Sequence, residues 1–275
     1  EHISGFGKII GKGKVEVTKD DKPAETISTK NIIIASGARP RSIPGVEIDR
    51  KKIITSTEAM ILQEVPHSML IIGGGAIGVE FAYFYNTFGT KVTVIEMMPN
   101  ILPVEDKEIS KLLESNLKKY GIEIMTDSKV EKVNIDGDVS ITLSTKDRQK
   151  QIKGEVALLA IGVQGNVENF GLDELGVKYE KSFIKVNEYY KTNIEGIYAI
   201  GDVVGAPLLA HVASAEGITC VEAIAGKNPP QVDYENIPGC TYCQPQVASI
   251  GLTEEKAIEQ GVKIKVGRFP FAASG

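Results

Sequence analysis

The chain has 275 residues, of which 42% are hydrophobic and 24% are charged, a balance typical of a globular protein with about two domains. Its net charge of −5 comes without a block of basic residues, which argues against binding of nucleic acid or an anionic membrane surface. No apolar run approaches the ~18 residues of a membrane span, and the first residues lack a signal-peptide pattern. Three cysteines are too few for a disulfide framework, so we expect a cytoplasmic protein.

The first block of the chain, residues 1–45, is expected to be β structure. Alternating residues at Lys14–Val17 predict a strand, and a second strand returns after it. The apolar segment Asn31–Gly37 is typical of a buried parallel strand that ends in small residues. Pro40 and Pro44–Gly45 then interrupt the chain, and we expect a domain boundary there.

The second block, residues 46–164, contains the most informative segment. The apolar strand Met69–Ile72 runs directly into a Gly-x-Gly-x-x-Gly turn over Gly73–Gly78, and a helical segment follows. A second strand, Lys91–Ile95, ends on Glu96. Together, strand, glycine turn, helix and distal acid predict a Rossmann-like dinucleotide site, whereas the glycines alone would also fit an unrelated turn.

Each glycine of this turn has a physical role in binding a dinucleotide. Gly73 permits the tight turn, Gly75 lets the backbone approach a pyrophosphate, and Gly78 lets the helix pack closely on the strand. At the N-terminus of the helix, around Ala76 and Ile77, unpaired N–H groups face the phosphate charge.

Glu96 sets the expected nucleotide preference. A carboxylate at this position accepts protons from the ribose hydroxyls and repels a 2′-phosphate. No Arg or Lys follows it in Met97–Asn100. The pattern therefore predicts NAD rather than NADP.

The rest of this block predicts a helix and a β-meander. A helix is expected from about Asp106 to Tyr120, with acids in its first turn and Lys118 and Lys119 in its last. Strands that complete the sheet are expected at Ile122–Met125, Lys129–Ile135, Val139–Ser144 and Val156–Ile161.

The third block, residues 165–235, contains a strand that ends on an acid. The apolar segment Ile197–Ile200 leads into Gly201–Asp202, and a helix is expected at Val212–Ala225. A carboxylate at the carboxyl edge of a parallel sheet lies where ligands bind. Asp is also a common turn residue, so this segment alone would fit a simple turn equally well.

The fourth block, residues 236–275, is expected to begin a further domain. Strands are predicted at Val247–Leu252 and Val262–Val266, and a helix is predicted to begin near Thr253.

In order, type and spacing, Ser36–Gly37, Gly73–Glu80 and Thr192–Asp202 resemble the flavoprotein disulfide reductases, which bind two dinucleotides. The resemblance implies an α/β fold of doubly wound parallel sheets with a β-meander crossover. A partial FAD domain in two parts would flank a complete NAD domain, and a truncated dimer-interface domain would follow. Leu208–Gly217 and Ile101–Asp106 are similar to the dihydrolipoamide dehydrogenase branch.

That branch implies oxidation of dihydrolipoamide through a redox disulfide and FAD, with hydride transfer to NAD+. It also implies a homodimer and a lipoyl-domain carrier as partner. The implied NAD contacts are Gly73, Gly75, Ala76, Ile77, Gly78, Glu80, Glu96, Val130 and Gly162. The implied FAD contacts are Gly7, Ser36, Gly37, Asp202, Leu208, Leu209, Ala210 and His211.

Departures from the family pattern concern the catalytic groups. The FAD-pyrophosphate glycines and the Cys-x4-Cys pair are expected before Glu1, and the His-Glu pair after Gly275. We therefore expect no catalytic residue among these 275 residues and no lipoamide turnover by the chain as given. The loop Gly162–Asn166 also lacks the Arg-Pro pair of many members.

Two other functions stay open from the sequence. The parent could be another flavin disulfide reductase or an NADH oxidase, or the chain could be a non-catalytic NAD-binding module. Cys240 and Cys243 have Cys-x-x-Cys spacing but lack a thioredoxin-like context, so we interpret them as incidental. His2 and His67 are scattered, and no metal site is expected.

Overall fold

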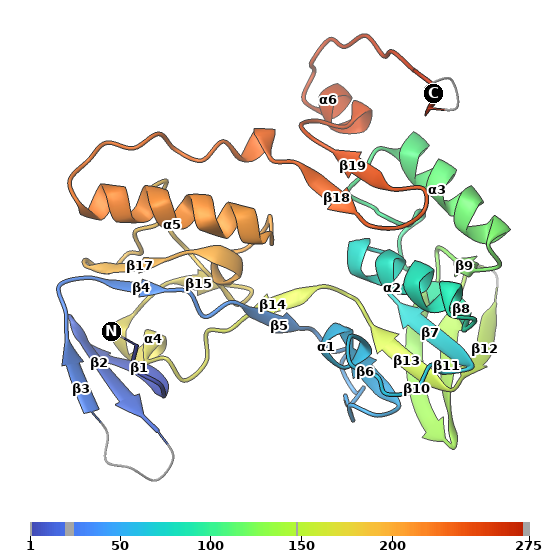
Figure 1. The fold of residues 1–275 in the computed structure, drawn as a ribbon, viewed down its shortest axis with the longest axis horizontal. Coiled ribbons are helices and arrows are strands. Elements are labelled where there is room, and N and C mark those ends of the chain that lie inside the picture. The colour runs from blue at the N-terminus through green and yellow to red at the C-terminus, as the bar shows by residue number, and fades with distance from the viewer. Residues whose placement is uncertain (1, 20–24, 147, 272–275) are drawn as a thin grey trace. The chain divides into compact units, whose positions relative to one another are not determined.

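The computed structural model describes residues 2–19, 25–146 and 148–271 (Figure 1). The chain divides into two compact units, each built from two separate stretches of sequence. Unit 1 consists of Glu1–Arg39 and Val163–Tyr234, and unit 2 of Pro40–Gly162 and Glu235–Gly275. Within the described residues, no helix has the length and hydropathy that a membrane span requires.

Unit 2 is built on a five-stranded parallel sheet in the order β6-β13-β7-β8-β9 (Figure 1). The strands are β6 (Ile53–Thr55), β13 (Val156–Leu159), β7 (Ser68–Ile72), β8 (Lys91–Ile95) and β9 (Glu123–Met125). The helices are α1 (Ser56–Ala59), α2 (Ala76–Thr87) and α3 (Lys107–Lys119). The antiparallel β-meander consists of β10 (Lys129–Asp136), β11 (Asp138–Ser144) and β12 (Gln149–Gly154).

The two faces of this sheet are covered by different elements. Met69 and Ile71 of β7 pack in one core cluster with residues of α2 and α3. Leu70 and Ile72 of the same strand pack in another cluster with residues of β11. Because successive side chains of a strand point to opposite faces, helices cover one face and the meander covers the other. Burial on both faces explains why β7 is a continuous apolar run.

Helix boundaries in unit 2 follow from capping side chains. The Asp106 carboxylate accepts a hydrogen bond of 2.9 Å from the Glu108 N–H, and Asp106 is the N-cap of α3. Thr55 and Glu58 form a capping box at the start of α1. The predicted helix near Asp106–Tyr120 is therefore confirmed to within one residue at each end.

The last segment of unit 2 is only partly as expected. A short hairpin forms from β18 (Gly239–Thr241) and β19 (Val247–Ser249), and Thr253 caps α6 (Glu254–Glu259) as predicted. The predicted strand Val262–Val266 is wrong, because this segment has no strand structure and pairs with none of the described strands. Val262 and Val266 are each nearly half exposed, so their alternation with polar residues buries no face.

The described residues of unit 1 form small sheets and two α-helices. Its antiparallel sheet contains β1 (Phe6–Gly11), β2 (Lys14–Thr18) and β3 (Glu25–Ser28). The paired strands are β4 (Ile32–Ile34) with β17 (Ile197–Ala199), β5 (Ala38–Pro40) with β14 (Val163–Gly165), and β15 (Tyr179–Glu180) with β16 (Phe183–Ile184). The α-helices are α4 (Leu172–Leu175) and α5 (Ala210–Ile224), and a short 3-10 helix, η1 (Gly201–Val204), precedes α5. Another 3-10 helix, η2 (Tyr234–Asn236), begins at the last residue of unit 1.

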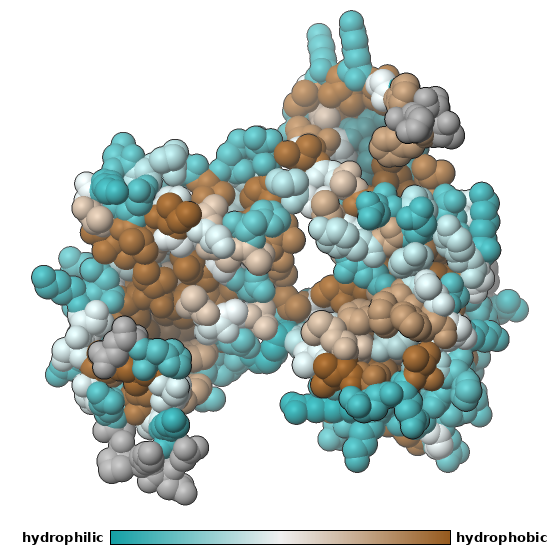
Figure 2. All heavy atoms as spheres, in the orientation of Figure 1, coloured by the Kyte–Doolittle hydropathy of each residue, from teal (hydrophilic) through white to brown (hydrophobic). Residues whose placement is uncertain are grey.

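The parallel pair of β4 and β17 confirms that Asn31–Gly37 contains a strand of parallel type. Apolar residues gather on the face of unit 1 that carries α5, β17 and β4 (Figure 2). Exposed apolar side chains of these elements include Ile33, Ile218 and Val221. Parallel strands are normally buried on both faces, so this apolar surface is unusually open.

Among the described glycines of unit 2, Gly78 in the first turn of α2 has the least room for a side chain. A Cβ added to Gly78 would lie 1.9 Å from the Gly73 carbonyl oxygen, whereas one added to Gly75 would meet nothing within 4 Å. We expect Gly78→Ala to lower the free energy of unfolding in urea by at least about 2 kcal/mol, because either α2 or the end of β7 must shift. Gly75→Ala is the matched control and should change it by less than about 1 kcal/mol. Equal effects of the two substitutions would contradict this packing.

Candidate cofactor sites

The turn between β7 and α2 presents unshared N–H groups to solvent. Gly73 has φ +108° and its N–H donates to the Ile95 carbonyl at 2.8 Å, which fixes the turn beside the end of β8. Gly75 is the N-cap of α2, and no side chain caps this helix. The first N–H groups of a helix need acceptors, and its positive end favours an anion. The turn therefore has the form of a phosphate-binding site.

A cavity of about 470 Å³ opens at this turn and brings together five of the expected NAD residues. They are Gly73, Gly75, Glu96, Val130 and Gly162. Gly78 does not line the cavity, because it packs against Gly73. Ala76 and Ile77 precede Gly78 in the first turn of α2 and do not line the cavity either.

Glu96 is held in this cavity by backbone groups. One carboxylate oxygen accepts the Gly74 N–H at 2.6 Å, and the other accepts the Met98 N–H at 2.7 Å. The residue is 8% exposed. These bonds join the acid directly to the glycine turn, and each oxygen keeps a lone pair for a ligand hydroxyl.

Two cationic residues, Arg41 and Lys129, also line this cavity and were missed from the sequence. The Arg41 N–H donates to the Gly162 carbonyl at 3.0 Å, and Lys129 follows Ser128, whose N–H donates to the Glu96 carbonyl at 2.9 Å. Both cations come from distant segments, so only the tertiary structure could identify them.

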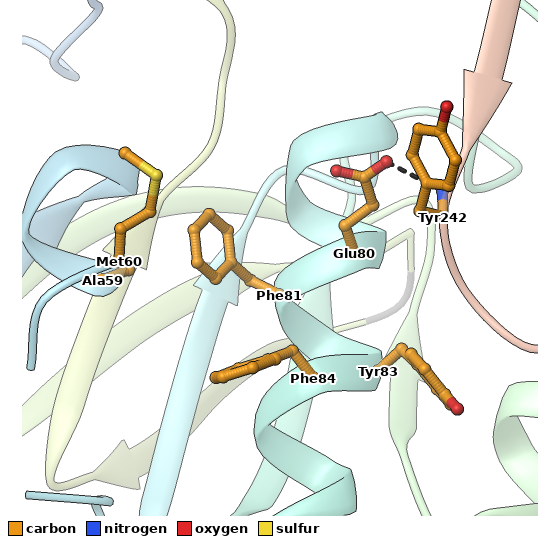
Figure 3. A pocket seen from close by; sticks show the side chains of 7 residues that line it. All are labelled: Ala59, Met60, Glu80, Phe81, Tyr83, Phe84 and Tyr242. Carbon is orange, nitrogen blue, oxygen red and sulfur yellow. Dashed lines mark hydrogen bonds between the residues drawn. The ribbon is translucent and has the colours of Figure 1, made fainter.

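Glu80 is an expected NAD residue that lines a different cavity of unit 2. It lines a second cavity of about 390 Å³ with apolar and aromatic side chains of α2 and with Met60 and Tyr242 (Figure 3). Its carboxylate accepts the Tyr242 N–H at 2.8 Å. Within unit 2, Glu80 thus anchors the β18–β19 hairpin to α2 and is separate from the cavity at the glycine turn.

In unit 1, most of the expected FAD residues lie where β4 and β17 end. These parallel strands pair at Ile34 and Ala199, so Ser36–Gly37 and Gly201–Asp202 follow them at one edge. Asp202 is half-buried, and among the described residues its carboxylate has no hydrogen-bond or ion-pair partner. An acid in this state can accept hydroxyl groups of a sugar or ribitol chain.

Leu208–His211 form the start of α5. The helix begins at Ala210, two residues before the predicted Val212, with Leu209 as N-cap and no capping side chain. A Cβ on Gly201 would lie 3.3 Å from the Ala213 Cβ, so the first turn of α5 packs beside Gly201–Asp202. Gly7 is not brought to this edge, because it pairs with Val17 in the antiparallel sheet.

Asn166 ties the end of β4 to the loop after β14. The Ser36 hydroxyl donates to the Asn166 carbonyl at 2.7 Å, and the Asn166 amide donates back to the Ser36 carbonyl at 2.8 Å. Arg39 in turn donates to the Asn166 side chain at 2.9 Å and binds both oxygens of Glu168. Arg39 thus supplies a guanidinium to this loop from β5.

Cys240 and Cys243 differ in environment. Cys240 is exposed, whereas Cys243 is buried in the core cluster of α2 and α3. Burial raises the pKa of the Cys243 thiol to about 11, which is opposite to the lowered pKa of redox thiols. In the described part of the chain, no group of three or more His, Cys, Asp or Glu side chains could hold a metal ion.

Acid should weaken the Arg39–Glu168 pair. The hydrogen bonds from Arg39 lower the pKa of Glu168 to about 2, from an unfolded value of about 4.3. The pair thus stabilises the fold above the unfolded pKa, and this stability is lost as the pH falls toward 2. Because Glu168 is 52% exposed, we expect a contribution below about 1 kcal/mol.

Urea unfolding at about pH 5 and about pH 2.5 measures this contribution. Glu168→Gln should lose less stability between the two pH values than the unsubstituted chain, and Glu188→Gln, at an exposed acid of the same unit, should behave like the unsubstituted chain. If Glu168→Gln loses as much stability between the two pH values as the unsubstituted chain, the Arg39–Glu168 pair does not contribute as proposed.

Comparison with known proteins identifies the family of the chain. The family model "Pyridine nucleotide-disulphide oxidoreductase" matches residues 3–217, and the model of that family's dimerisation domain matches residues 237–275. A dihydrolipoyl dehydrogenase of Rhizobium etli is 48% identical over 99% of this chain, and one of Bacillus subtilis is 43% identical over 99%. The chain covers 60% of the length of each of these relatives.

Solved structures show the same fold. The flavoprotein disulfide reductase RclA from Escherichia coli has a TM-score of 0.87 and 27% identity, covering 98% of this chain and 61% of that chain. LpdA from Mycobacterium tuberculosis has a TM-score of 0.86 and 25% identity, covering 94% of this chain and 57% of that chain. The expected fold class is confirmed, and the expected cofactors, FAD and NAD, are those of the matched family. The chain belongs to the pyridine nucleotide-disulphide oxidoreductase family.

Proposed function

We propose that this chain supplies the NAD-binding domain and part of the FAD site of a dihydrolipoamide dehydrogenase. The observation that carries the proposal is the cavity at the β7–α2 turn, where the glycine turn, an uncapped helix N-terminus and a buried acid meet. Identities of 43–48% to dihydrolipoyl dehydrogenases over nearly the whole chain favour this branch of the family.

The NAD site proposed here fits the chemistry of its ligand. The open space beside Gly75 leaves room for a pyrophosphate against the first turn of α2. Glu96 would accept the ribose hydroxyls, and Val130 and Gly162 would contact the rest of the dinucleotide in the same cavity. Arg41 and Lys129 would add positive charge near the phosphates.

The flavin residues proposed here also fit their ligand. Asp202, whose carboxylate has no partner among the described residues, would accept the ribitol hydroxyls, and Ser36–Gly37 lie at the same edge. The uncapped N-terminus of α5, at Leu208–His211, would favour negative charge on a flavin ring. When bound, FAD supplies the two-electron chemistry that links dithiol oxidation to hydride transfer, while the protein orients it and sets its electrostatic environment.

The wider biology of the parent protein is part of this proposal. Residues 237–275, which match a dimerisation domain, would begin the interface of a homodimer. Residues 1–45 and 165–235 would form the FAD domain and residues 46–164 the NAD domain. The substrate would be dihydrolipoamide on a lipoyl-domain carrier, and three cysteines without a disulfide framework favour the cytoplasm.

Glu96→Gln tests the nucleotide site. A glutamine cannot accept from both Gly74 and Met98, and it no longer repels a 2′-phosphate, so NADH affinity should fall about tenfold while NADPH affinity does not fall. Fluorescence titration with each nucleotide measures the ratio. Glu123→Gln, at an exposed acid at the start of the neighbouring strand β9, is the matched control and should keep the ratio of the unsubstituted chain. An unchanged ratio in Glu96→Gln would contradict the role of Glu96.

Titration with FAD, followed by flavin fluorescence and absorption, tests the flavin half of the proposal. We expect binding, with affinity lowered about tenfold in Asp202→Ala because its hydrogen bonds to the ribitol are lost. Asp173→Asn, an exposed acid of α4, should bind like the unsubstituted chain. A chain that binds NADH but no FAD would instead favour a non-catalytic NAD-binding module.

A further inference from the structure

A buried carboxylate in unit 1, that of Glu216, has no part in the function proposed so far. Glu216 lies in α5 and is 2% exposed. Among the described residues it forms no ion pair, although burying a carboxylate without a counter-charge is costly. Its two oxygens are instead satisfied by neutral donors: Oε2 accepts the Gly201 N–H at 2.6 Å, and Oε1 accepts the Tyr234 hydroxyl at 2.7 Å.

A second tyrosine extends this network. The hydroxyls of Tyr234 and Tyr190 lie 2.9 Å apart. Burial raises the pKa of both phenols, so both keep their protons. Because the single proton of Tyr234 is donated to Glu216, the Tyr190 hydroxyl must donate to the Tyr234 oxygen.

The network returns to the strand that precedes Asp202. The Tyr190 carbonyl accepts the Ala199 N–H at 3.0 Å, and Ala199 is the last residue of β17. The Ile200 N–H donates to the Ile34 carbonyl of β4 at 3.0 Å. Three successive N–H groups, at residues 199–201, are therefore fixed by Tyr190, β4 and Glu216, and Asp202 is the next residue.

The backbone at Gly201 can rotate more freely than at other residues, because glycine adopts positive and negative φ about equally well. Its φ of +71° lies in the left-handed region, and the first turn of α5 packs against it at Ala213. A small rotation at Gly201 would turn the Asp202 carboxylate away from the edge of β4 and β17. The hydrogen bond to Glu216 opposes that rotation.

We propose that Glu216 is a positioning residue for flavin binding, which holds the Gly201 N–H and thereby aims Asp202, and that Tyr234 and Tyr190 hold Glu216 in place. The proposal rests on the proposed function in one respect, the contact of Asp202 with the ribitol. We do not propose that Glu216 or either tyrosine contacts the flavin itself.

Hydrogen exchange without any cofactor tests the first step. Glu216→Ala should speed exchange of the Gly201 amide by about tenfold or more, because its acceptor is lost. Glu216→Gln should restore protection, since its amide oxygen can accept from Gly201 while its NH2 donates to Tyr234. Glu222→Gln, on the same helix and paired with Lys227, is the matched control. Unchanged exchange in Glu216→Ala would overturn the proposal.

A double-mutant cycle with Asp202→Ala tests the second step. Tyr234→Phe keeps the ring and removes only the hydroxyl, so it serves even if Glu216→Ala does not fold. We expect either variant to weaken FAD binding about tenfold when Asp202 is present and less than about twofold in the Asp202→Ala background. A merely structural role would give the same loss in both backgrounds. NADH affinity should stay unchanged throughout.

The outcomes separate the two levels of the proposal. If the unsubstituted chain takes up no FAD, the proposed function itself is wrong, and the flavin role of Glu216 falls with it. If FAD binds but the Glu216 and Tyr234 variants bind it equally well, only the positioning role is overturned.

Discussion

The contact between Gly78 and the Gly73 carbonyl is the constraint on which the rest of unit 2 depends. A Cβ at Gly78 would lie 1.9 Å from that oxygen, so only glycine lets the first turn of α2 reach the end of β7. This approach places the N-terminus of α2 at the mouth of the cavity and leaves the N–H groups of its first turn uncapped. It also places Gly74 where its N–H can reach Glu96. The close approach of α2 to β7 at Gly78 thus underlies the packing of the helix, the expected anion site and the expected ribose contact.

Both units have an acid at the end of parallel strands, but the two acids are positioned in different ways. In each, parallel strands end in small residues, and an acid at the edge is expected to bind a hydroxyl-rich part of a cofactor. In unit 2, that acid is Glu96, and backbone N–H groups hold it directly. In unit 1, no described residue forms a hydrogen bond or ion pair with the Asp202 carboxylate, and a second, buried acid at Glu216 holds the backbone beside it. We infer that a carboxylate can be positioned through its own oxygens or through the preceding peptide group.

Features encoded within short segments of the sequence could be predicted, whereas features that depend on contacts between distant segments could not. The glycine turn, the strand ending in Glu96 and the capped helix α3 are encoded within short segments, and all three were predicted. Strand β12 was missed because Gln149–Gly154 is mostly polar and pairs as a strand of the meander only through its neighbour β11. The alternation at Val262–Val266 suggested a strand, but a strand needs a pairing partner. Arg41, Lys129 and the environment of Glu216 depend on contacts between distant segments, which one sequence does not reveal.

Calorimetric titration of the purified chain with NADH and, in parallel, with NADPH tests the proposed NAD site most directly. We predict that NADH binds at least about tenfold more tightly, a difference of about 1.4 kcal/mol. Such a result would agree with the geometry in which Glu96 is fixed beside the glycine turn. Equal affinity for the two nucleotides, or binding of neither, would contradict it.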